Sequence, residues 1–447
     1  MKKETFLKDS VVVFGSRVAI LLINLIRSVV VARALGPVGR GMVSLAFMVP
    51  TLAVLLAKLD ISTANVYFIG RRRFRLEQVI ANSILFALLN GTFFVVLLFL
   101  LFPWLNRTLL QDLESPILFY VSILTIPCSL LSSYLLSTIK GLRQFVGHSL
   151  AGILMPGAGV VFLLVASFLG QLTELQVIAF RLAAIIIQVI ALLLWLARRK
   201  ALHFTLRFDR VWLRVTTNFS MRNYVGSLSQ YLNKRLDLYL VAFLLGPEDI
   251  GYYVVAVALT EHFLQIPIAL SIVLLPNVAS AESQEANRFT PIVSRLAVTA
   301  VSVAVAVFWL ILDILVPLVY TDKFEPSILP LRLLLPGAVS LTLWDILTND
   351  LVGRGRPEYK SLSTGVALAI TLVLNAFLTP LYGIAGAAIA STLAYTAAAT
   401  VGFLLYRRVT GARLADVLII RRSDLHLLYR ATLSLRQRLS HRIAEVF

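Results

Sequence analysis

Charged and amide side chains interrupt an apolar stretch at residues 227–247, SLSQYLNKRLDLYLVAFLLGP, which is long enough to cross a bilayer. A helix that faced lipid there would carry only apolar side chains. At about 100° per residue, its polar positions fall within roughly a third of the helix circumference. These positions are Asn223, Ser227, Gln230, Asn233, Lys234 and Asp237. The stripe therefore predicts a surface that borders water or other polar groups.

The charge on this stripe allows two interpretations. Three ionised groups at mid-membrane cost about 8–10 kcal/mol on insertion scales, which a few leucines at about 0.5 kcal/mol each do not offset. Lys234 and Asp237 could pair with each other as a structural bridge. Alternatively, the stripe lines a cavity that binds an anion. The excess of Lys and Arg over carboxylates on this stripe and its counterpart favours the cavity.

Composition identifies the class of protein that must position these residues. Of the 447 residues, 59% are hydrophobic and only 14% are charged, and the mean hydropathy is +0.86. These values indicate a polytopic membrane protein and exclude a soluble core. The net charge of +18 is concentrated in short loops and in the C-terminal tail, so membrane topology explains it better than nucleic-acid binding.

The sequence predicts no cofactor and no metal site. The single cysteine, Cys128, lies in an apolar segment and can form neither a disulfide nor a multi-cysteine site within the chain. The five histidines are scattered without the spacing of metal ligands.

Apolar runs predict twelve transmembrane helices and no other regular structure, an all-α fold. Alternate connections are rich in Lys and Arg, as in Arg71–Arg75 and Arg198–Arg214, and such loops stay cytoplasmic. Both termini are therefore predicted on the cytoplasmic side. Arg17, Asn24 and Arg27 interrupt the first apolar run, which we interpret as an uncleaved spanning helix rather than a signal peptide.

Short motifs recur in the same order in the two halves of the chain. The loop GPVGRG at 36–41 returns as GPEDIG at 246–251, which is 210 positions later. Gly15-Ser16 matches Gly226-Ser227, and the loop at 141–145 matches the loop at 355–359. Together these matches predict a parallel repeat of six helices plus six, arranged as two pseudo-symmetric bundles.

The repeat divides the chain into four predicted parts. Residues 1–197 and 219–407 form the two six-helix bundles. Residues 198–218 form a basic amphipathic cytoplasmic linker, and residues 408–447 form a basic amphipathic cytoplasmic tail. Their basic and apolar residues predict binding of both segments to anionic membrane lipid.

The repeat also predicts a site. Arg17 and Asn24 share a face of the first span with Arg27 at its edge, so facing bundles would bring them opposite the stripe on the seventh span. The predicted cavity residues are Arg17, Asn24, Arg27, Lys58, Gln230, Asn233, Lys234 and Asp237. Lys58 could instead snorkel to the interface. Glu261 and Asp345 are candidates for ion coupling or for structural pairing.

Three stretches carry a resemblance to a known family. ARALGPVGRG, KLDISTANVYFIGRRR and LDLYLVAFLLGPEDIGYYVVAVALTE resemble bacterial polysaccharide or O-antigen-repeat flippases, members of the multidrug/oligosaccharidyl-lipid/polysaccharide exporter superfamily. The resemblance covers residues 1 to about 407. It implies two six-helix bundles in a V around a central cavity, which opens alternately to each side. It also implies transport of polyprenyl-diphosphate-linked oligosaccharides to the outer leaflet of the bacterial cytoplasmic membrane, with a polysaccharide polymerase as a candidate partner.

Other functions remain open at this stage. A lipid II flippase or an ion-coupled multidrug exporter would share the superfamily fold, although a cation exporter predicts acidic residues in the cavity. A membrane-embedded glycosyltransferase or polymerase would need a catalytic carboxylate or histidine constellation in a sizeable loop, and the predicted outer loops are short. The sequence therefore favours a transporter over an enzyme.

Overall fold

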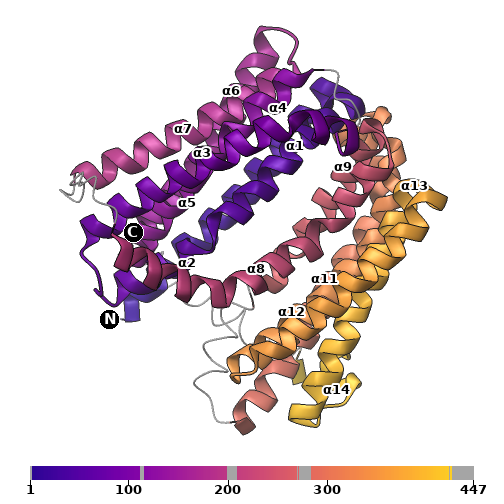
Figure 1. Ribbon diagram of the computed structural model, residues 1–447. Helices are drawn as coiled ribbons and strands as arrows, with labels where there is room; N and C mark the ends of the chain where they lie inside the picture. Colours follow the sequence, from indigo (N-terminus) through magenta and orange to yellow (C-terminus); the bar gives the residue numbers. More distant parts are fainter. Residues whose placement is uncertain are drawn as a thin grey trace, which may run out of the picture. The chain divides into compact units, whose positions relative to one another are not determined.

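The structure, a computed structural model, describes residues 3–110, 115–198, 209–268, 270, 283–421 and 423–424. All regular structure in these ranges is helical, as Figure 1 shows. The helices are α1 (Lys3–Lys58), α2 (Ile61–Gly70), α3 (Leu76–Thr108), α4 (Pro116–Ile123), α5 (Thr125–Gly141), α6 (Phe145–Leu169), α7 (Glu174–Arg198), α8 (Arg210–Leu244), α9 (Pro247–Phe263), α11 (Ser283–Tyr320), the 3-10 helix η1 (Asp322–Ser327), α12 (Ile328–Gly353), α13 (Pro357–Thr410) and α14 (Leu414–Leu418).

Eight helical segments among the described residues are long and apolar enough to cross a membrane. Two of them, Gly15–Gly70 and Pro357–Thr410, are 56 and 54 residues long. A straight helix of that length would extend about 80 Å, far beyond a hydrocarbon core of about 30 Å. Each contains one glycine with non-helical backbone angles, Gly36 and Gly383, where the helix bends. The chain is thus a multi-pass membrane protein, and the layout of twelve spans stays a prediction.

The described contacts divide the chain into two compact units. The first comprises Met1–Ala258, Asp313–Leu331 and Leu372–Ala388, and the second comprises the remainder. These units do not follow the repeat, so the two bundles, the linker and the tail remain predictions. Residues 199–208 of the linker and residues 422 and 425–447 of the tail lie outside the described residues.

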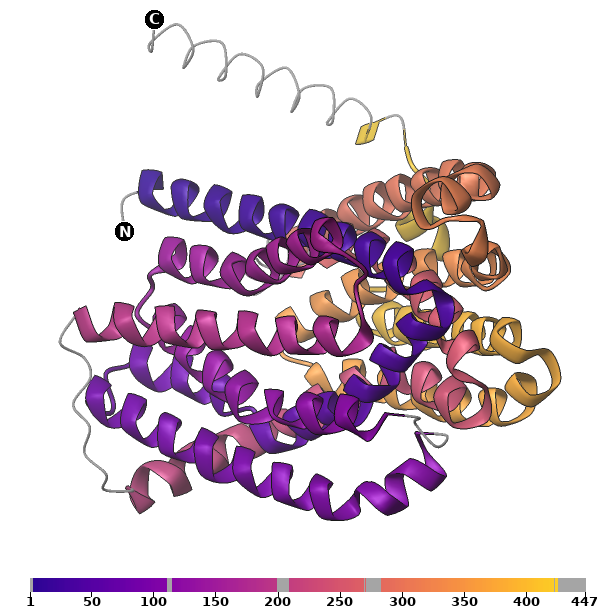
Figure 2. The same ribbon diagram turned by 90° about the horizontal axis from the view of Figure 1, so that it is seen from above.

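Within the first unit, α1 packs against α6, α3 against α5, and α6 against α7. These helices run along a common direction in both views (Figures 1 and 2). Helix α8 is fixed to this group where it begins. Asp209 accepts hydrogen bonds from the backbone N–H groups of Val211 and Trp212, and its own N–H donates to Asn82. The Trp212 side chain is fully buried, so apolar burial and an N-cap together anchor the start of α8.

The bend in α1 is held by side-chain contacts on both sides of it. Gly36 has φ 68°, a conformation that glycine adopts without a Cβ penalty. Arg40 reaches back across the bend and donates to the Ser28 carbonyl at 2.6 Å and to the Ser28 hydroxyl at 2.9 Å. Arg33 donates to the carbonyls of Leu318 and Val319 at the end of α11, where a cation also complements the helix dipole.

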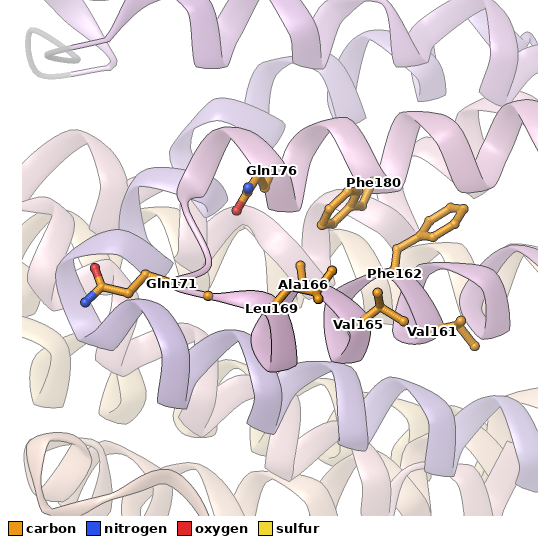
Figure 3. A pocket seen from close by; sticks show the side chains of 9 residues that line it. Val161, Phe162, Val165, Ala166, Leu169, Gln171, Gln176 and Phe180 are labelled. Carbon is orange, nitrogen blue, oxygen red and sulfur yellow. The ribbon is translucent and has the colours of Figure 1, made fainter.

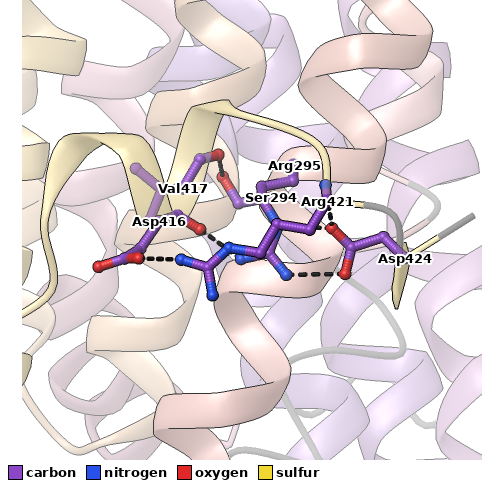
Figure 4. A network of polar contacts seen from close by, with 6 residues as sticks. All are labelled: Ser294, Arg295, Asp416, Val417, Arg421 and Asp424. Carbon is purple, nitrogen blue, oxygen red and sulfur yellow. Dashed lines mark hydrogen bonds and ion pairs between the residues drawn. The ribbon is translucent and has the colours of Figure 1, made fainter.

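In the second unit, the segment after α13 docks on α11 through a buried ion pair (Figure 4). The guanidinium of Arg295 donates to both carboxylate oxygens of Asp424, at 2.7 and 2.8 Å, and to the carbonyl of Asp416 at 2.7 Å. Ser294 donates to the carbonyl of Val417, whose side chain is fully buried. The hydrogen bonds from Arg295 hold the pKa of Asp424 below its ordinary value. This docking fixes the first part of the predicted tail.

Candidate functional site

Three arginines gather in the first unit, and we call Arg27, Arg40 and Arg181 the arginine cluster. Arg27 lies close enough to Arg40 and to Arg181 to repel both electrostatically. The bend at Gly36 makes this possible, because it turns the second half of α1 so that Arg40 reaches the level of Ser28, one residue after Arg27. Helix α7 contributes Arg181. Residues distant in the sequence therefore concentrate positive charge in one place.

Arg181 is held by an aromatic ring rather than by an acid. Its guanidinium lies over the ring of Phe47 with 4.2 Å to the ring centre, a cation–π contact. Its Nε atom is buried without a hydrogen-bond partner. No hydrogen bond or ion pair joins Arg27 or Arg181 to another residue in the described part of the chain. Two guanidinium groups thus keep donors available for a ligand.

Helix α8 completes the surroundings of the arginine cluster with tyrosines. Tyr231 is an electrostatic neighbour of Arg181. The hydroxyls of Tyr231 and Tyr239 are 3.2 Å apart, and Tyr239 donates to the carbonyl of Met48 at 3.1 Å. These contacts place the polar stretch of α8 beside the second half of α1. The site therefore combines elements from α1, α7 and α8.

The chemistry that this arrangement supports is anion binding. Guanidinium groups present a planar fork of N–H donors that matches the oxygens of phosphate and carboxylate groups. Repulsion between Arg27 and Arg181 would be relieved by an anion of two or more negative charges placed between them. Since the groups are partly shielded from water, each hydrogen bond to such an anion is stronger than in solution.

The structure places the predicted cavity residues in different surroundings. Arg17 is exposed, whereas Asn24, Arg27, Lys58, Gln230 and Lys234 are half-buried, and Asn233 and Asp237 are buried. Only Arg27 among them belongs to the arginine cluster. Arg17 is an electrostatic neighbour of His148, and Lys58 is one of Asp60. Whether Asn24 and Lys234 lie on opposing walls of one cavity stays a prediction.

Asp237 lies in the packing between α8 and α9. The hydroxyl of Tyr253 donates to one carboxylate oxygen at 2.7 Å, and both residues are buried. The other oxygen accepts from the backbone N–H of Leu238. Lys234 is half-buried, and no ion pair or hydrogen bond joins it to Asp237 or to any other residue that the structure describes. The geometry therefore favours separate roles for the two charges over the structural bridge.

This separation predicts distinct effects of the two substitutions. Lys234→Ala should abolish transport while leaving the amount of protein in the membrane nearly unchanged. Asp237→Ala leaves the buried Tyr253 hydroxyl without this acceptor, which should destabilise the protein by about 1–3 kcal/mol. Transport in vesicles and abundance in membranes measure the two effects. A Lys234→Ala, Asp237→Ala double variant with restored transport would show that Lys234 has only a structural role.

The two candidates for ion coupling belong to the second unit. Asp345 forms an ion pair with Lys360 at 3.7 Å, and Lys360 also donates to Asn349 at 2.9 Å and lies over the ring of Trp344. Glu261 is half-buried and has interacting neighbours. The pairing of Asp345 is compatible with a structural role, and ion coupling stays a prediction for both. In the part of the chain that the structure describes, no group of three or more His, Cys, Asp or Glu could hold a metal ion.

An open groove of about 490 Å³ lies where α6 ends and α7 begins (Figure 3). Its lining is apolar apart from Gln171 and Gln176 at the turn. It offers an anion no charged partner, so we do not assign the site to it.

Sequence reasoning missed Arg181 and treated Arg40 only as part of the loop at 36–41. Arg181 interrupts an apolar run, and an ionisable residue inside a span is a functional candidate by default. That signal could have found it. Arg40 is only 7% exposed, which its position beside Gly39 and Gly41 did not reveal.

Comparisons with known proteins place the chain in a family. The sequence pattern of the family described as Polysaccharide biosynthesis protein matches residues 30–329. A curated relative, the "Probable low-salt glycan biosynthesis flippase Agl15" of Haloferax volcanii, is 22% identical over 182 residues. That match spans 40% of this chain and 39% of the relative, so the chain matches well under half of that protein's length.

Solved structures share the fold. An inward-facing multidrug resistance MATE family transporter of the MOP superfamily superposes with a TM-score of 0.75 at 17% identity, covering 90% of this chain and 98% of that one. The lipid II flippase MurJ in an inward closed conformation also superposes with a TM-score of 0.75, at 13% identity. That match covers 96% of this chain and 93% of the MurJ chain. The family pattern covers more than half of the chain, and it confirms the resemblance seen in the sequence: the chain belongs to the polysaccharide biosynthesis protein family.

Proposed function

We propose that the protein is a flippase that moves a polyprenyl-diphosphate-linked oligosaccharide from the cytoplasmic to the outer leaflet by alternating access. Its family, the glycan flippase among its relatives and the fold of its structural neighbours support a transporter of this kind. The observation that carries the substrate class is the pair of guanidinium groups of Arg27 and Arg181, which are electrostatic neighbours and are bound to no acid among the described residues.

A diphosphate suits this pair because its charge and its oxygens are grouped within a few ångströms. Each guanidinium group can donate two parallel hydrogen bonds to one phosphate. Arg40 adds positive charge while its own donors hold Ser28. Lys234, Gln230 and Asn24 are proposed to meet the substrate nearby, the lysine at the diphosphate and the amides at the sugar. The polyprenyl tail remains in lipid throughout.

The proposal includes the architecture of the family fold. Each of the two bent segments counts as two spans, so the eight apolar segments give ten, and α8 and α9 bring the number to twelve. We place these helices in two six-helix bundles around a central cavity, with both termini on the cytoplasmic side of the cell membrane. Anionic lipid at the linker and tail and a polysaccharide polymerase are the proposed partners. Transport requires no cofactor, and Glu261 and Asp345 are the proposed residues for ion coupling.

Purified protein in vesicles tests this function. A short fluorescent oligosaccharide on polyprenyl diphosphate is placed in both leaflets, and an added glycosidase cleaves only the sugars on the outside. With the flippase present, we expect nearly all of the sugar to become cleavable, whereas protein-free vesicles keep about half protected. Lipid II and a cationic dye serve as competing substrates. Movement of the dye without movement of the diphosphate lipid would favour a multidrug exporter, and movement of lipid II alone would favour a cell-wall precursor flippase.

A further inference from the structure

The two equivalent Gly-Pro turns of the repeat pack directly against each other within the first unit. A Cβ atom added to Gly41 would lie 1.7 Å from the carbonyl oxygen of Pro247. A Cβ atom added to Gly251 would lie 2.0 Å from the carbonyl oxygen of Pro37. Real Cβ atoms do not approach backbone oxygens so closely. Each glycine therefore allows a contact between two backbones that no other residue permits.

This contact is symmetric with respect to the repeat. Gly41 and Gly251 are 210 positions apart, and so are Pro37 and Pro247. Each glycine of one turn faces the proline carbonyl of the other turn. A contact of this kind is self-complementary, like the interface of a two-fold symmetric dimer, but here both surfaces belong to one chain. We call this contact the Gly-Pro clasp.

Both halves of the clasp contact the region where α11 ends and η1 follows. On one side, Arg40 holds Ser28 across the bend of α1, and the Ser28 hydroxyl is 3.1 Å from that of Tyr320. On the other side, Tyr252 donates to Glu248 at 2.6 Å and contacts the ring of Phe324. The rings of Tyr320 and Phe324 lie 6.0 Å apart, so the two turns share a support where α11 ends and η1 follows. The closest approaches at the contact join the glycines to the proline carbonyl groups.

We propose that the Gly-Pro clasp is a reversible closure between the two repeats, which separates to let the substrate headgroup leave. The inference rests on the proposed function, because a headgroup that crosses between two repeats must pass the contacts that join them. Under the proposed topology, both turns lie at the outer end, so the clasp closes the exit. Backbone contacts with glycine are weak individually, which suits a contact that opens and closes repeatedly. Opening the clasp also separates the Ser28 hydroxyl from that of Tyr320.

Substitution of either glycine should hold the clasp open. Gly41→Ala and Gly251→Ala each place a methyl group against a proline carbonyl, and the symmetry of the contact predicts the same effect for both. Gly226→Ala is a matched control, since an added Cβ there meets nothing within 4 Å.

The test measures the distance between two spin labels beside the turns. Ala34 and Leu244 are equivalent in the repeat, precede the two turns and are both exposed. Ala34→Cys and Leu244→Cys are therefore labelled in a Cys128→Ala background that has no other cysteine. In the labelled protein in lipid, with all glycines intact, we expect two distances between the labels. The short distance reports the closed clasp and the longer distance reports the open clasp. In Gly41→Ala and Gly251→Ala, the short population should fall at least twofold, and Gly226→Ala should match the parent. A single distance with intact glycines, with and without the lipid-linked oligosaccharide, would overturn the proposal even if the glycine variants do not fold.

The outcome separates this inference from the proposed function. The label–label distances are measured without transport. Two distances in a protein that moves no diphosphate lipid would support the clasp and contradict the proposed substrate. Transport of the diphosphate lipid by a protein with a single label–label distance would contradict the clasp and support the proposed substrate.

Discussion

Replacement of Arg181 by alanine is expected to slow translocation of the diphosphate-linked sugar by roughly 10- to 150-fold, because a hydrogen bond to a charged group contributes about 1.5–3 kcal/mol. The amount of protein in the membrane should change little. The variant loses the contact with Phe47, but it also removes the repulsion between Arg181 and Arg27. Arg181→Lys should retain part of the activity, since it keeps the charge and loses the planar fork. The vesicle assay with the glycosidase measures all three proteins.

A second arginine on an aromatic ring provides the control. Arg332 lies over the ring of Trp309 at 5.3 Å in the second unit, a cation–π contact of the same kind as that of Arg181. Arg332→Ala should therefore reproduce any general effect of losing such a contact and leave translocation near the parent rate. Full transport by Arg181→Ala at normal abundance would mean that the arginine cluster does not bind the diphosphate.

The second large effect is expected at Arg295, whose replacement by alanine should undock the segment that follows α13. Removing one partner of a buried ion pair costs about 3–5 kcal/mol, because the other charge stays buried. Here Asp424 escapes that cost when residues 411–424 leave the surface of α11. We therefore expect local release rather than unfolding, seen as trypsin cleavage after Arg413 at least ten times faster than in the parent.

The exposed pair beside it supplies the control. Arg421 and Asp416 also form an ion pair, but their side chains are 55% and 32% exposed, and such pairs contribute at most about 1 kcal/mol. Arg421→Ala should leave cleavage after Arg413 almost unchanged. Arg295→Met combined with Asp424→Leu should restore docking, because an apolar pair of similar size carries no buried charge. Equal cleavage of Arg295→Ala and Arg421→Ala would contradict the prediction.

The same ion pair gives docking a pH dependence. The pKa of Asp424 is lowered in the folded protein, chiefly by the hydrogen bonds from Arg295. Such a carboxyl stabilises the docked segment fully above its unfolded pKa of about 3.9, and the stabilisation is lost as the pH falls through the lower folded value. Release of the segment is thus expected only below about pH 4. The variant with Arg295→Met and Asp424→Leu should show no such release.

Features that depend on residues adjacent in the sequence could be predicted from the sequence alone. Helices and membrane spans follow from hydropathy over contiguous residues. The Gly-Pro turns at 36–41 and 246–251 are visible as a short sequence motif that occurs twice. The structure adds that these two turns touch, which the repeat made plausible but did not specify. A helical wheel also placed Asp237 on the polar face of α8. It could not identify Tyr253 as its partner, because that contact depends on how α9 returns against α8.

The arginine cluster shows where sequence reasoning ended. Arg181 stands alone in an apolar run, and its meaning depends on Arg27 and Phe47, more than a hundred residues away. The bend at Gly36 decides whether Arg40 points to water or back to Ser28. The position of Arg181 in an apolar run marks it as a candidate, but its neighbours follow from the packing of distant helices. The reach of Arg40 follows from the angle of the bend, which the glycine permits but does not specify.

The contact of Arg33 with the end of α11 has a consequence for biosynthesis. Its acceptors, the carbonyls of Leu318 and Val319, follow it by 285 and 286 residues in the chain. At 5–20 residues per second, the ribosome needs roughly 15–60 s to supply them after Arg33 has been made. During that time the guanidinium must be solvated by water or by lipid phosphates. Helix α1 therefore reaches its final contacts only after α11 has been made.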